Sequence, residues 1–392
     1  FVMDHLGDCT LTYVCVYWYC EEAQPKFDEL LRNVPRFCYF HKDCLLVSQG
    51  RWDMAFFFQE LWFESGSTGS SHDFSRTILD QTRRQEFHQR FKHVVERFDV
   101  VFCQYPLVLC SYLLPFDVRI IVRSTMRFDY FACSPASQSA IGADLWSVLA
   151  KGRVFVSNLL DQRYFQEFLN MSTELWPSLG WHAVPEAQNV NQSHEDILVL
   201  PNTLRQDYSC FQSIQRYLVE LRSQAQASGL GRRFVNVREA HGPLYALRDL
   251  AAHQAALILP YTTPTVSISE AYALGLTLIM PSPRMLATLH KERGFLCQLN
   301  SPCNGEGQLR GKDLHDWLSL GEAYQWPHIL TFSSTEELLK VVGTLQDIQG
   351  VRDKVHGHLE GQVRRMVPAL AFELRRQVAA LRVISRTSSE QK

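Results

Sequence analysis

The sequence predicts an α/β fold made of two doubly wound domains. Short apolar runs alternate with longer amphipathic stretches along most of the 392 residues. The short runs are apolar on both faces, which is typical of parallel strands covered by helices on each side. A repeated strand–helix–strand alternation implies right-handed βαβ units and therefore parallel sheets. At roughly 150 residues per domain, the chain has room for two or three domains.

The first half contains the elements of one such domain. Phe87, Phe91, Val94 and Val95 share one face of a predicted helix whose other face is charged. The segment 170–195 is rich in Pro, Asn and Gln and predicts a linker. Strands are predicted at 11–18, 99–103, 119–122 and 152–156, and helices at 28–33, 77–97 and 161–169.

The second half alternates more regularly. Strands are predicted at 197–200, 234–237, 256–259, 277–280 and 329–332, and helices at 211–227, 243–253, 266–274 and from 335 onward. A long basic amphipathic stretch at 351–383 closes the chain. We therefore expect a first domain over 1–185, a second over 186–345, and terminal helices over 346–392 that cross back to the first domain.

Composition and motifs exclude several classes of protein. Lys and Arg total 39 against 41 Asp and Glu, a net charge of −2 without a basic block, which argues against a nucleic-acid partner. The motifs GxGxxG, GxxxxGKS/T and HExxH are absent from the sequence, so sites for a nicotinamide dinucleotide, a P-loop nucleotide or a protease zinc are unsupported. His356 and His358 lack a third ligand at metal-site spacing, and no pair of acids follows a strand. We expect no metal and no cofactor.

Cysteine usage bears on the compartment. The eleven cysteines form no CxxC pair. Cys103 and Cys110 lie in an apolar run and are expected to be buried hydrophobic side chains. Cys297 and Cys303 bracket a short polar loop and can pair in an oxidising compartment.

Membrane and targeting signals are weak. The most apolar stretch, 100–122, contains charges and prolines and does not fit a membrane span. The sequence begins at Phe1 without a leader, so we expect any membrane attachment to lie in a segment missing from this chain. Sequons begin at Asn170 and Asn191. These features favour the secretory lumen, in the Golgi or the endoplasmic reticulum, with the cytoplasm as the alternative.

A hydroxyl-rich turn followed by a helix dominates the segment 257–289. In parallel sheets, ligands bind beyond the carboxyl ends of strands, and the free N–H groups of a helix N-terminus attract an anion such as a diphosphate. Glu270, in the first or second turn of the helix, can accept hydrogen bonds from a ribose diol. The alternative is that these side chains only cap the helix. The hydroxyl side chains are Thr262, Thr263, Thr265, Ser267 and Ser269.

The segment SISEAYALGLTLIMPS, at 267–282, resembles the nucleotide-sugar segment of glycosyltransferases of the GT-B architecture. The resemblance, which extends as a pattern over 95–345, implies two Rossmann-like domains facing each other across a cleft, with Glu270 on the donor ribose. Many members carry a second acid eight residues earlier, where this chain has Thr262. The departure leaves a retaining or an inverting outcome open. Segments that agree with the family are VLPN at 199–202, PLYALRDLAAHQAALILP at 243–260 and PHILTFSSTEELLKVV at 327–342.

Two charged residues follow the predicted strand at 119–122. Arg127 can bind a phosphate or an acidic acceptor through its planar guanidinium group. Asp129 can act as the catalytic base that deprotonates an acceptor hydroxyl. The alternative is a surface ion pair between these neighbours.

Further candidates follow the other strands. Arg205 and Arg284 come after strands of the second domain, where either can neutralise the diphosphate. His241, in the loop after another strand, can approach the donor base. Asn158 and Asp161 follow the strand at 152–156 in a pattern that is typical of a helix cap.

The sequence thus predicts a hexosyl- or pentosyltransferase that moves a sugar from a nucleotide-diphosphate donor to a hydroxyl of a glycan or glycoprotein acceptor, without a metal. The alternatives are a non-catalytic glycan-binding or scaffold protein on the same fold, and a sugar-nucleotide epimerase.

Overall fold

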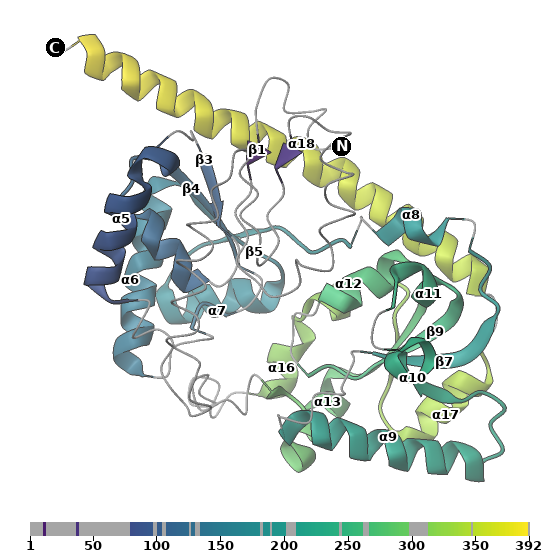
Figure 1. Ribbon diagram of the computed structural model, residues 1–392. Coiled ribbons are helices and arrows are strands. Elements are labelled where there is room, and N and C mark those ends of the chain that lie inside the picture. The colour runs from purple at the N-terminus through teal and green to yellow at the C-terminus, as the bar shows by residue number, and fades with distance from the viewer. Residues whose placement is uncertain are drawn as a thin grey trace. The chain divides into compact units, whose positions relative to one another are not determined.

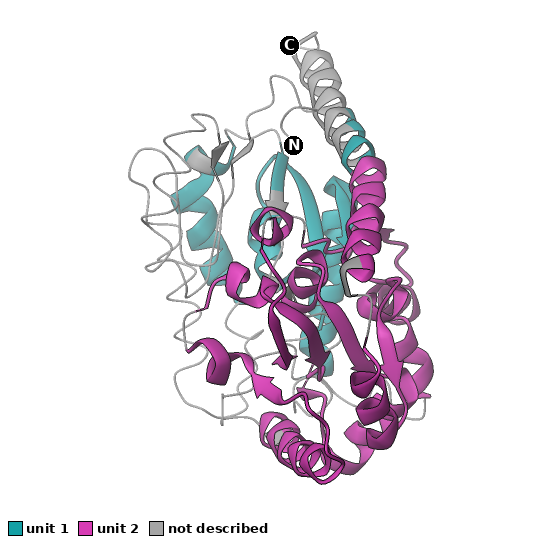
Figure 2. Cartoon of the chain, turned by 90° about the vertical axis from the view of Figure 1, so that its right-hand side faces the viewer, with its two compact units in different colours: residues 1–124, 128–155, 367–392 teal, residues 125–127, 156–366 magenta. Residues whose placement is uncertain are grey.

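The computed structural model of the chain divides into two compact units (Figures 1 and 2). Unit 1 comprises Phe1–Ser124, Phe128–Phe155 and Val367–Lys392, and unit 2 comprises Thr125–Arg127 and Val156–Met366. The structure describes residues 11–12, 37–38, 79–96, 100–103, 107–124, 127–129, 134–180, 183–188, 190–200, 209–242, 245–261, 266–297, 313–345 and 348–390.

Unit 1 contains most of a four-stranded sheet with the order β3-β4-β5-β6. Strands β3 and β4 are parallel, with Val100 opposite Arg119, as expected. The predicted helix at 77–97 is confirmed as α5, and the strand predicted at 11–18 is described only at β1. The turn predicted at 28–33 lies outside the described residues. The elements are β1 (Leu11–Thr12), β2 (Phe37–Cys38), α5 (Gln81–Val95), β3 (Val100–Cys103), η1 (Leu107–Leu113), β4 (Arg119–Ser124), α6 (Pro135–Lys151) and β5 (Arg153–Val156).

Helix α6 is present although the sequence did not lead us to predict a helix there. Ser134 caps its N-terminus by accepting a hydrogen bond from the Ser137 backbone, and Pro135 occupies the first helical position. Ile141, Leu145 and Val148 form its buried face. The Ser-Pro pair is a start signal that identifies such a helix from sequence.

Unit 2 is built around a five-stranded parallel sheet with the order β11-β10-β9-β7-β8. In register, Leu200 of β7 lies opposite Ile258 of β9, and Thr277 of β10 lies opposite Ala255 of β9. The parallel sheet expected here is confirmed. The strands are β7 (His194–Leu200), β8 (Phe234–Asn236), β9 (His253–Ile258), β10 (Thr277–Pro281) and β11 (Leu330–Phe332).

Helices cover both faces of this sheet, because alternate side chains of each strand point to opposite faces. Ile197 and Val199 pack into one apolar core, whereas Leu198 and Leu200 pack into the other. Each fully buried aliphatic side chain contributes about 1.5–3 kcal/mol. The first core contains α9 (Ser209–Ala227), α13 (Pro283–Arg293) and α17 (Thr335–Gly343), and the second contains α11 (Leu247–Ala251), α12 (Val266–Ala273) and part of α18 (Ile348–Glu390).

Three segments differ from the prediction. The expected linker at 170–195 contains β6 (Glu174–Leu175) and α8 (Val184–Ala187), and the division between the units falls after Phe155 rather than near 185. Two shorter helices, α10 (Val237–His241) and α11, replace the helix expected at 243–253. A capping box formed by Asn236 and Glu239 marks the N-terminus of α10. The terminal helices are one 43-residue helix, α18, whose Pro368 lies beside the division after Met366.

Two further helices belong to unit 2, namely α7 (Leu159–Leu169) and α16 (Leu314–Ser319). The 3-10 turn η3 (Glu322–Gln325) follows α16. Within the described ranges, the longest helices are too polar, and the apolar ones too short, to span a bilayer.

Gly275 is expected to be intolerant of a side chain. Its φ is +73°, and an added Cβ would lie 2.6 Å from Cγ of Arg352. Arg352 cannot move aside, because its guanidinium group donates to the carbonyl oxygens of Val190 and Ala251 at 3.1 and 3.0 Å. Gly275→Ala should therefore lower the free energy of unfolding by about 1–3 kcal/mol, measured by denaturant titration of circular dichroism.

The matched control is Gly357→Ala in α18, where an added Cβ meets nothing within 4 Å. This substitution should leave stability unchanged or raise it by up to about 1 kcal/mol, since Ala favours helix over Gly. Equal effects of the two substitutions would contradict the steric argument.

Candidate functional site

The strand order of unit 2 creates a switch point between β7 and β9. The chain passes from β7 to β8 on one side and returns to β9 on the other side of β7. Helix α9, after β7, packs on one face of the sheet, and α12, after β9, packs on the opposite face. Ligands of open parallel sheets bind beyond the carboxyl ends of the strands at such a point. The predicted diphosphate contacts Arg205, Thr262 and Thr263 belong to the segments leaving these strands and lie outside the described residues.

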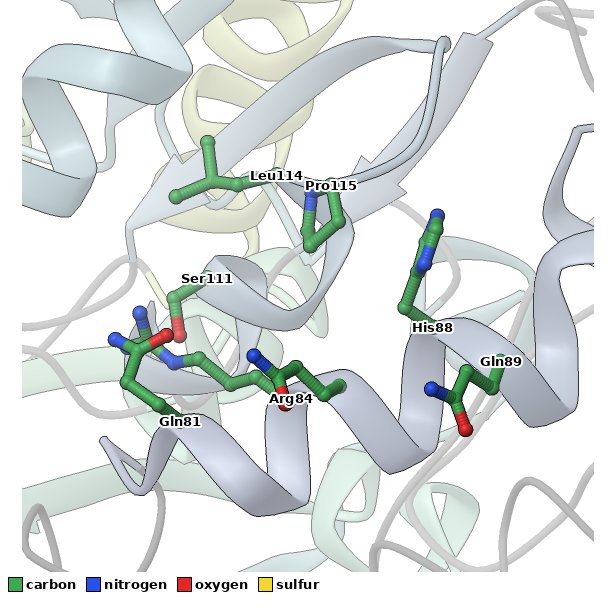
Figure 3. Close-up of a pocket in the computed structure, with 8 residues that line it drawn as sticks. Gln81, Arg84, His88, Gln89, Ser111, Leu114 and Pro115 are labelled. Atoms are coloured by element: carbon green, nitrogen blue, oxygen red, sulfur yellow. The ribbon is translucent and has the colours of Figure 1, made fainter.

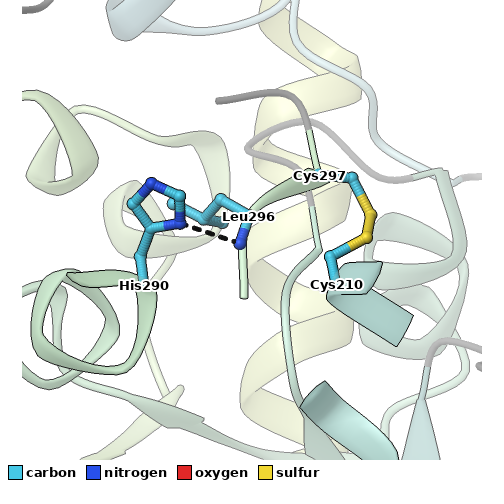
Figure 4. Close-up of a disulfide and its surroundings, with 4 residues drawn as sticks. All are labelled: Cys210, His290, Leu296 and Cys297. Atoms are coloured by element: carbon cyan, nitrogen blue, oxygen red, sulfur yellow. Dashed lines mark hydrogen bonds between the residues drawn. A yellow bond between two sulfur atoms is a disulfide. The ribbon is translucent and has the colours of Figure 1, made fainter. Parts of the chain in front are cut away.

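A disulfide fixes the described residues at this carboxyl edge (Figure 4). Cys210, in the first turn of α9, is bonded to Cys297, which follows α13. The backbone N–H of Cys297 donates to the carbonyl oxygen of Tyr261 at 2.8 Å, just beyond β9. The ring of Phe211 lies 5.0 Å from that of Tyr261, centroid to centroid. The start of α9 and the segment that leaves β9 are thus both tied to Cys297, by a covalent bond and by a hydrogen bond.

Helix α12 presents its N-terminus to the same edge, because it starts soon after the carboxyl end of β9. Ser269 is buried, whereas Ser267 and Glu270 are partly exposed, so Glu270 does not point into the apolar core. Gly180, with a φ of +59°, lies against this helix, and a Cβ there would sit 2.2 Å from the carbonyl oxygen of Ser269. The structure therefore places three predicted donor contacts on one helix at the switch point.

The other two predicted donor contacts lie apart from one another. Arg284 is exposed in the first turn of α13, which Ser282 caps directly after β10, so it lies at the carboxyl edge. His241 lies at the amino edge, since its Nε2 is 2.8 Å from Nε2 of His253, the first residue of β9. The structure does not bring His241 to the predicted donor site.

A buried polar cluster in unit 2 lies just after β5. Asn158 is the N-cap of α7, as predicted, and its Oδ1 accepts from the backbone of Asp161 at 2.8 Å. The carboxylate Oδ2 of Asp161 accepts from Nδ2 of Asn158 at 2.8 Å, and Oδ1 has no hydrogen-bond partner among the described residues. Burial raises the pKa of Asp161 to about 7, against the lowering effects of Asn158 and of the positive charge of Arg127.

Arg127 belongs to this cluster. Its side chain is 4% exposed, and its guanidinium carbon lies 5.3 Å from the ring centroid of Tyr164. Asp129, in unit 1, is also buried, at 1% exposure. The alternative predicted an ion pair between Arg127 and Asp129 on the surface, and its surface position is wrong because both side chains are buried.

A cavity of about 390 Å³ lies in unit 1 between α5 and the segment formed by η1 and the turn after it (Figure 3). Arg84 lines this cavity and donates hydrogen bonds to both carboxylate oxygens of Asp144, with Nη2 to Oδ2 at 2.6 Å. The carboxylate of Asp144 therefore neutralises the positive charge of Arg84. The lining offers amide and hydroxyl groups, which suit an uncharged polyhydroxyl ligand. The lining residues are Gln81, Arg84, Gln85, His88, Gln89, Ser111, Leu114 and Pro115.

The cysteines differ from the prediction in their pairing. Cys110 is buried, as predicted, but it forms a disulfide with Cys103, and the Cα atoms of the two residues are 5.8 Å apart. Cys297 pairs with Cys210, which is 87 residues away in sequence, and not with the nearby Cys303. Sequence proximity could not reveal that second partner.

One group of potential metal ligands is visible at the start of α16, formed by Asp313, His315 and Asp316. Two of the three side chains are exposed, and Asp313 is already the N-cap of the helix. Exposed acids of this kind are common without an ion, so the group gives no reason to assign a metal.

No protein-family model matches the chain, and no curated protein matches it either. The class that the fold defines is an α/β protein with two sheets of Rossmann-like type and a switch point in unit 2.

Asp161 should make stability depend on pH. The folded protein holds its carboxyl group protonated up to about pH 7, whereas the unfolded chain loses that proton near 3.8. Stability is therefore full below the unfolded value and is lost as the pH rises through about 7, by an amount on the order of a few kcal/mol. Asp161→Asn should flatten this dependence, as measured by thermal unfolding at a series of pH values.

The control for this experiment is Asp316→Asn, which changes an exposed carboxylate of the same unit. It should leave the pH dependence as in the unaltered chain. A pH profile that is unchanged in Asp161→Asn would rule out the neutral buried carboxyl.

The Cys210–Cys297 bond should stabilise unit 2 more than the Cys103–Cys110 bond stabilises unit 1. The first closes a sequence separation of 87 residues and the second one of 7, and longer loops lose more entropy in the unfolded chain. The double substitution of Cys210 and Cys297 by Ala should cost about 2–5 kcal/mol, read from the unfolding transition of the unit. Equal losses from the two double variants would contradict this ranking.

Proposed function

We propose that the protein is a glycosyltransferase that transfers a sugar from a nucleotide-diphosphate donor to a hydroxyl acceptor, and that unit 2 binds the donor. The observation that carries the proposal is the switch point between β7 and β9, beside which α12 starts. The free backbone N–H groups and the dipole of a helix N-terminus favour a diphosphate by about 0.3–2 kcal/mol. The resemblance of 267–282 to the donor segment of GT-B enzymes falls on this same helix and on β10.

In the proposed donor site, four of the predicted residues at this edge have a defined role. Glu270 accepts hydrogen bonds from the ribose diol, and the partly exposed Ser267 donates to a phosphate oxygen. Arg205 or Arg284 neutralises the charge that develops on the leaving diphosphate, in place of a metal. The exposed position of Arg284 beside the end of β10 supports this role.

We assign acceptor recognition to unit 1. The cavity beside α5 supports this assignment, since its three glutamines and Ser111 can hydrogen-bond sugar hydroxyls while Leu114 and Pro115 contact the apolar face of a sugar ring. The base role of Asp129 and the acceptor-binding role of Arg127 stay predictions, because both side chains are buried.

The two sheets, of four and five strands, are compatible with Rossmann-like domains and support the finer proposal that units 1 and 2 correspond to the two halves of the GT-B architecture. The two disulfides support the secretory lumen, since such bonds persist in oxidising compartments.

Glu270→Ala should weaken the binding of a nucleoside diphosphate. Loss of hydrogen bonds to a charged group costs about 1.5–3 kcal/mol, which corresponds to roughly a 10- to 150-fold rise in Kd. Isothermal titration calorimetry with uridine, guanosine, adenosine and cytidine diphosphates measures the effect. Glu292→Ala, an exposed change on α13, is the control and should bind as the unaltered chain does.

Three other results would favour a different assignment or a different function. Binding that is equally tight in Glu270→Ala contradicts the assignment of the ribose contact. No binding of any diphosphate by the unaltered chain favours the non-catalytic glycan-binding or scaffold protein. Conversion of a nucleotide sugar into its epimer without an acceptor favours the epimerase.

A further inference from the structure

Both Asn-X-Ser sequons of the sequence lie in unit 2, in segments that border regular elements. Asn170 follows α7, and Asn191 lies in the segment that leads into β7. In each sequon the asparagine and the serine are exposed. The residue between them faces the protein, since Met171 is 0% exposed and Gln192 is partly buried. Both segments therefore present the reactive side chains of the sequon to solvent.

The end of α7 fixes the first sequon. Asn170 is the C-cap residue of this helix, with a φ of 51°, in the left-handed region that asparagine tolerates better than most residues. The backbone N–H groups of Asn170 and Met171 both donate to the carbonyl oxygen of Phe165. Oδ1 of Asn170 accepts from Nε2 of Gln166 at 3.1 Å, whereas Nδ2 of Asn170 donates no hydrogen bond to the described residues. This nitrogen is the atom that carries an N-linked glycan.

The amino edge of the unit 2 sheet fixes the second sequon. Nε2 of Gln192 donates to the carbonyl oxygen of His253, the first residue of β9, at 2.9 Å. The carbonyl oxygen of Gln192 accepts from Nε2 of Gln254 at 3.3 Å. The backbone N–H of Ser193 donates to the carbonyl oxygen of Asn191 at 2.9 Å. The side chains of Asn191 and Ser193 make no hydrogen bond with the described part of the chain, so folding does not occupy them.

The asparagines that the structure describes fall into two kinds. Asn158 and Asn236 are buried, and their side chains cap α7 and α10. Asn170 and Asn191, which belong to the sequons, are exposed. A glycan is bulky and hydrated, so a folded protein carries it only on an asparagine whose amide nitrogen stays in solvent. Within the described ranges, sequon and exposure thus fall on the same asparagines.

We propose that Asn170 and Asn191 are N-glycosylation sites and that each carries one oligosaccharide. This inference goes beyond the transferase function and rests on the proposed secretory location. The oligosaccharide comes from a lipid-linked oligosaccharide diphosphate, and the cell's own oligosaccharide transferase catalyses the step. A bond forms between Nδ2 of the asparagine and the anomeric carbon, and the bond from that carbon to the diphosphate oxygen breaks. One amide proton passes to the released lipid diphosphate.

The glycan on Asn191 is compatible with the proposed donor site. Gln192, its neighbour in the chain, is hydrogen-bonded to the first residue of β9, so this sequon lies at the amino edge of the sheet. The nucleotide-diphosphate donor is assigned to the opposite, carboxyl edge. A glycan on Asn191 therefore leaves the donor site open.

Secretion of the full chain from a eukaryotic cell behind a cleavable leader, followed by digestion with peptide-N-glycosidase, tests the proposal. We expect the unaltered chain to carry two glycans, seen as two steps of electrophoretic mobility that the glycosidase removes. Peptide mass spectrometry should then find the aspartate that the glycosidase leaves at positions 170 and 191. The Cys210–Cys297 bond, identified in the same digest, shows that the chain has folded in an oxidising compartment.

Serine variants separate the glycan from the role of the asparagine in the fold. Ser172→Ala and Ser193→Ala should each remove one mobility step, because the sequon requires a hydroxyl at its third position. Both serines are exposed, and their side chains make no hydrogen bond with the described residues, so both variants should fold. Ser172→Ala also keeps Asn170 as the cap of α7. Ser172→Thr is the matched control and should keep both glycans.

A secreted chain that has formed the Cys210–Cys297 bond but carries no glycan overturns the proposal. A glycan at only one of the two positions overturns the assignment of the other. Mobility steps that persist when Ser172→Ala and Ser193→Ala are combined also overturn it, since the glycans would then lie elsewhere. Glycosylation does not depend on donor binding, so a chain that carries both glycans and binds no nucleoside diphosphate counts against the transferase function alone.

Discussion

The parallel ladder between β7 and β9 is the constraint on which the rest of unit 2 depends. Ile197 lies opposite Ala255 and Leu200 opposite Ile258, and all four side chains are buried. Because successive side chains alternate between faces, the ladder must be covered by helices on both sides. This requirement sends α9 to one face and α12 to the other, which creates the switch point at the carboxyl edge.

The same ladder explains why polar chemistry gathers at its two ends. The middle of each strand is apolar on both faces, so polar side chains next to these strands occupy their ends. The carboxyl edge holds the start of α12 and the Cys210–Cys297 bond, where backbone N–H groups favour an anion. The amino edge holds the stacked rings of His194 and His253.

Two buried polar side chains of unit 2, Arg352 and Asp161, avoid the cost of an unpaired buried charge in different ways. Arg352 crosses from α18 to the carbonyl oxygens of Val190 and Ala251, and this contact explains why position 275 requires glycine. Asp161 avoids carrying a buried charge, since burial raises the pKa of its carboxyl group to about 7 and so keeps the group neutral below that pH. Burial of a charge costs far more than burial of a paired neutral group, so the proton is retained.

The sequence by itself determined the parallel α/β class, the strands of unit 2, and helices such as α5, α9 and α12, because apolar periodicity and capping residues are local signals. It also identified Asn158 as a cap. Only the tertiary structure decided the partner of Cys297, the burial of Asp129 and the meeting of His194 with His241. These depend on contacts between residues far apart in the chain, and local patterns carry no information about which distant segments the sheet brings together.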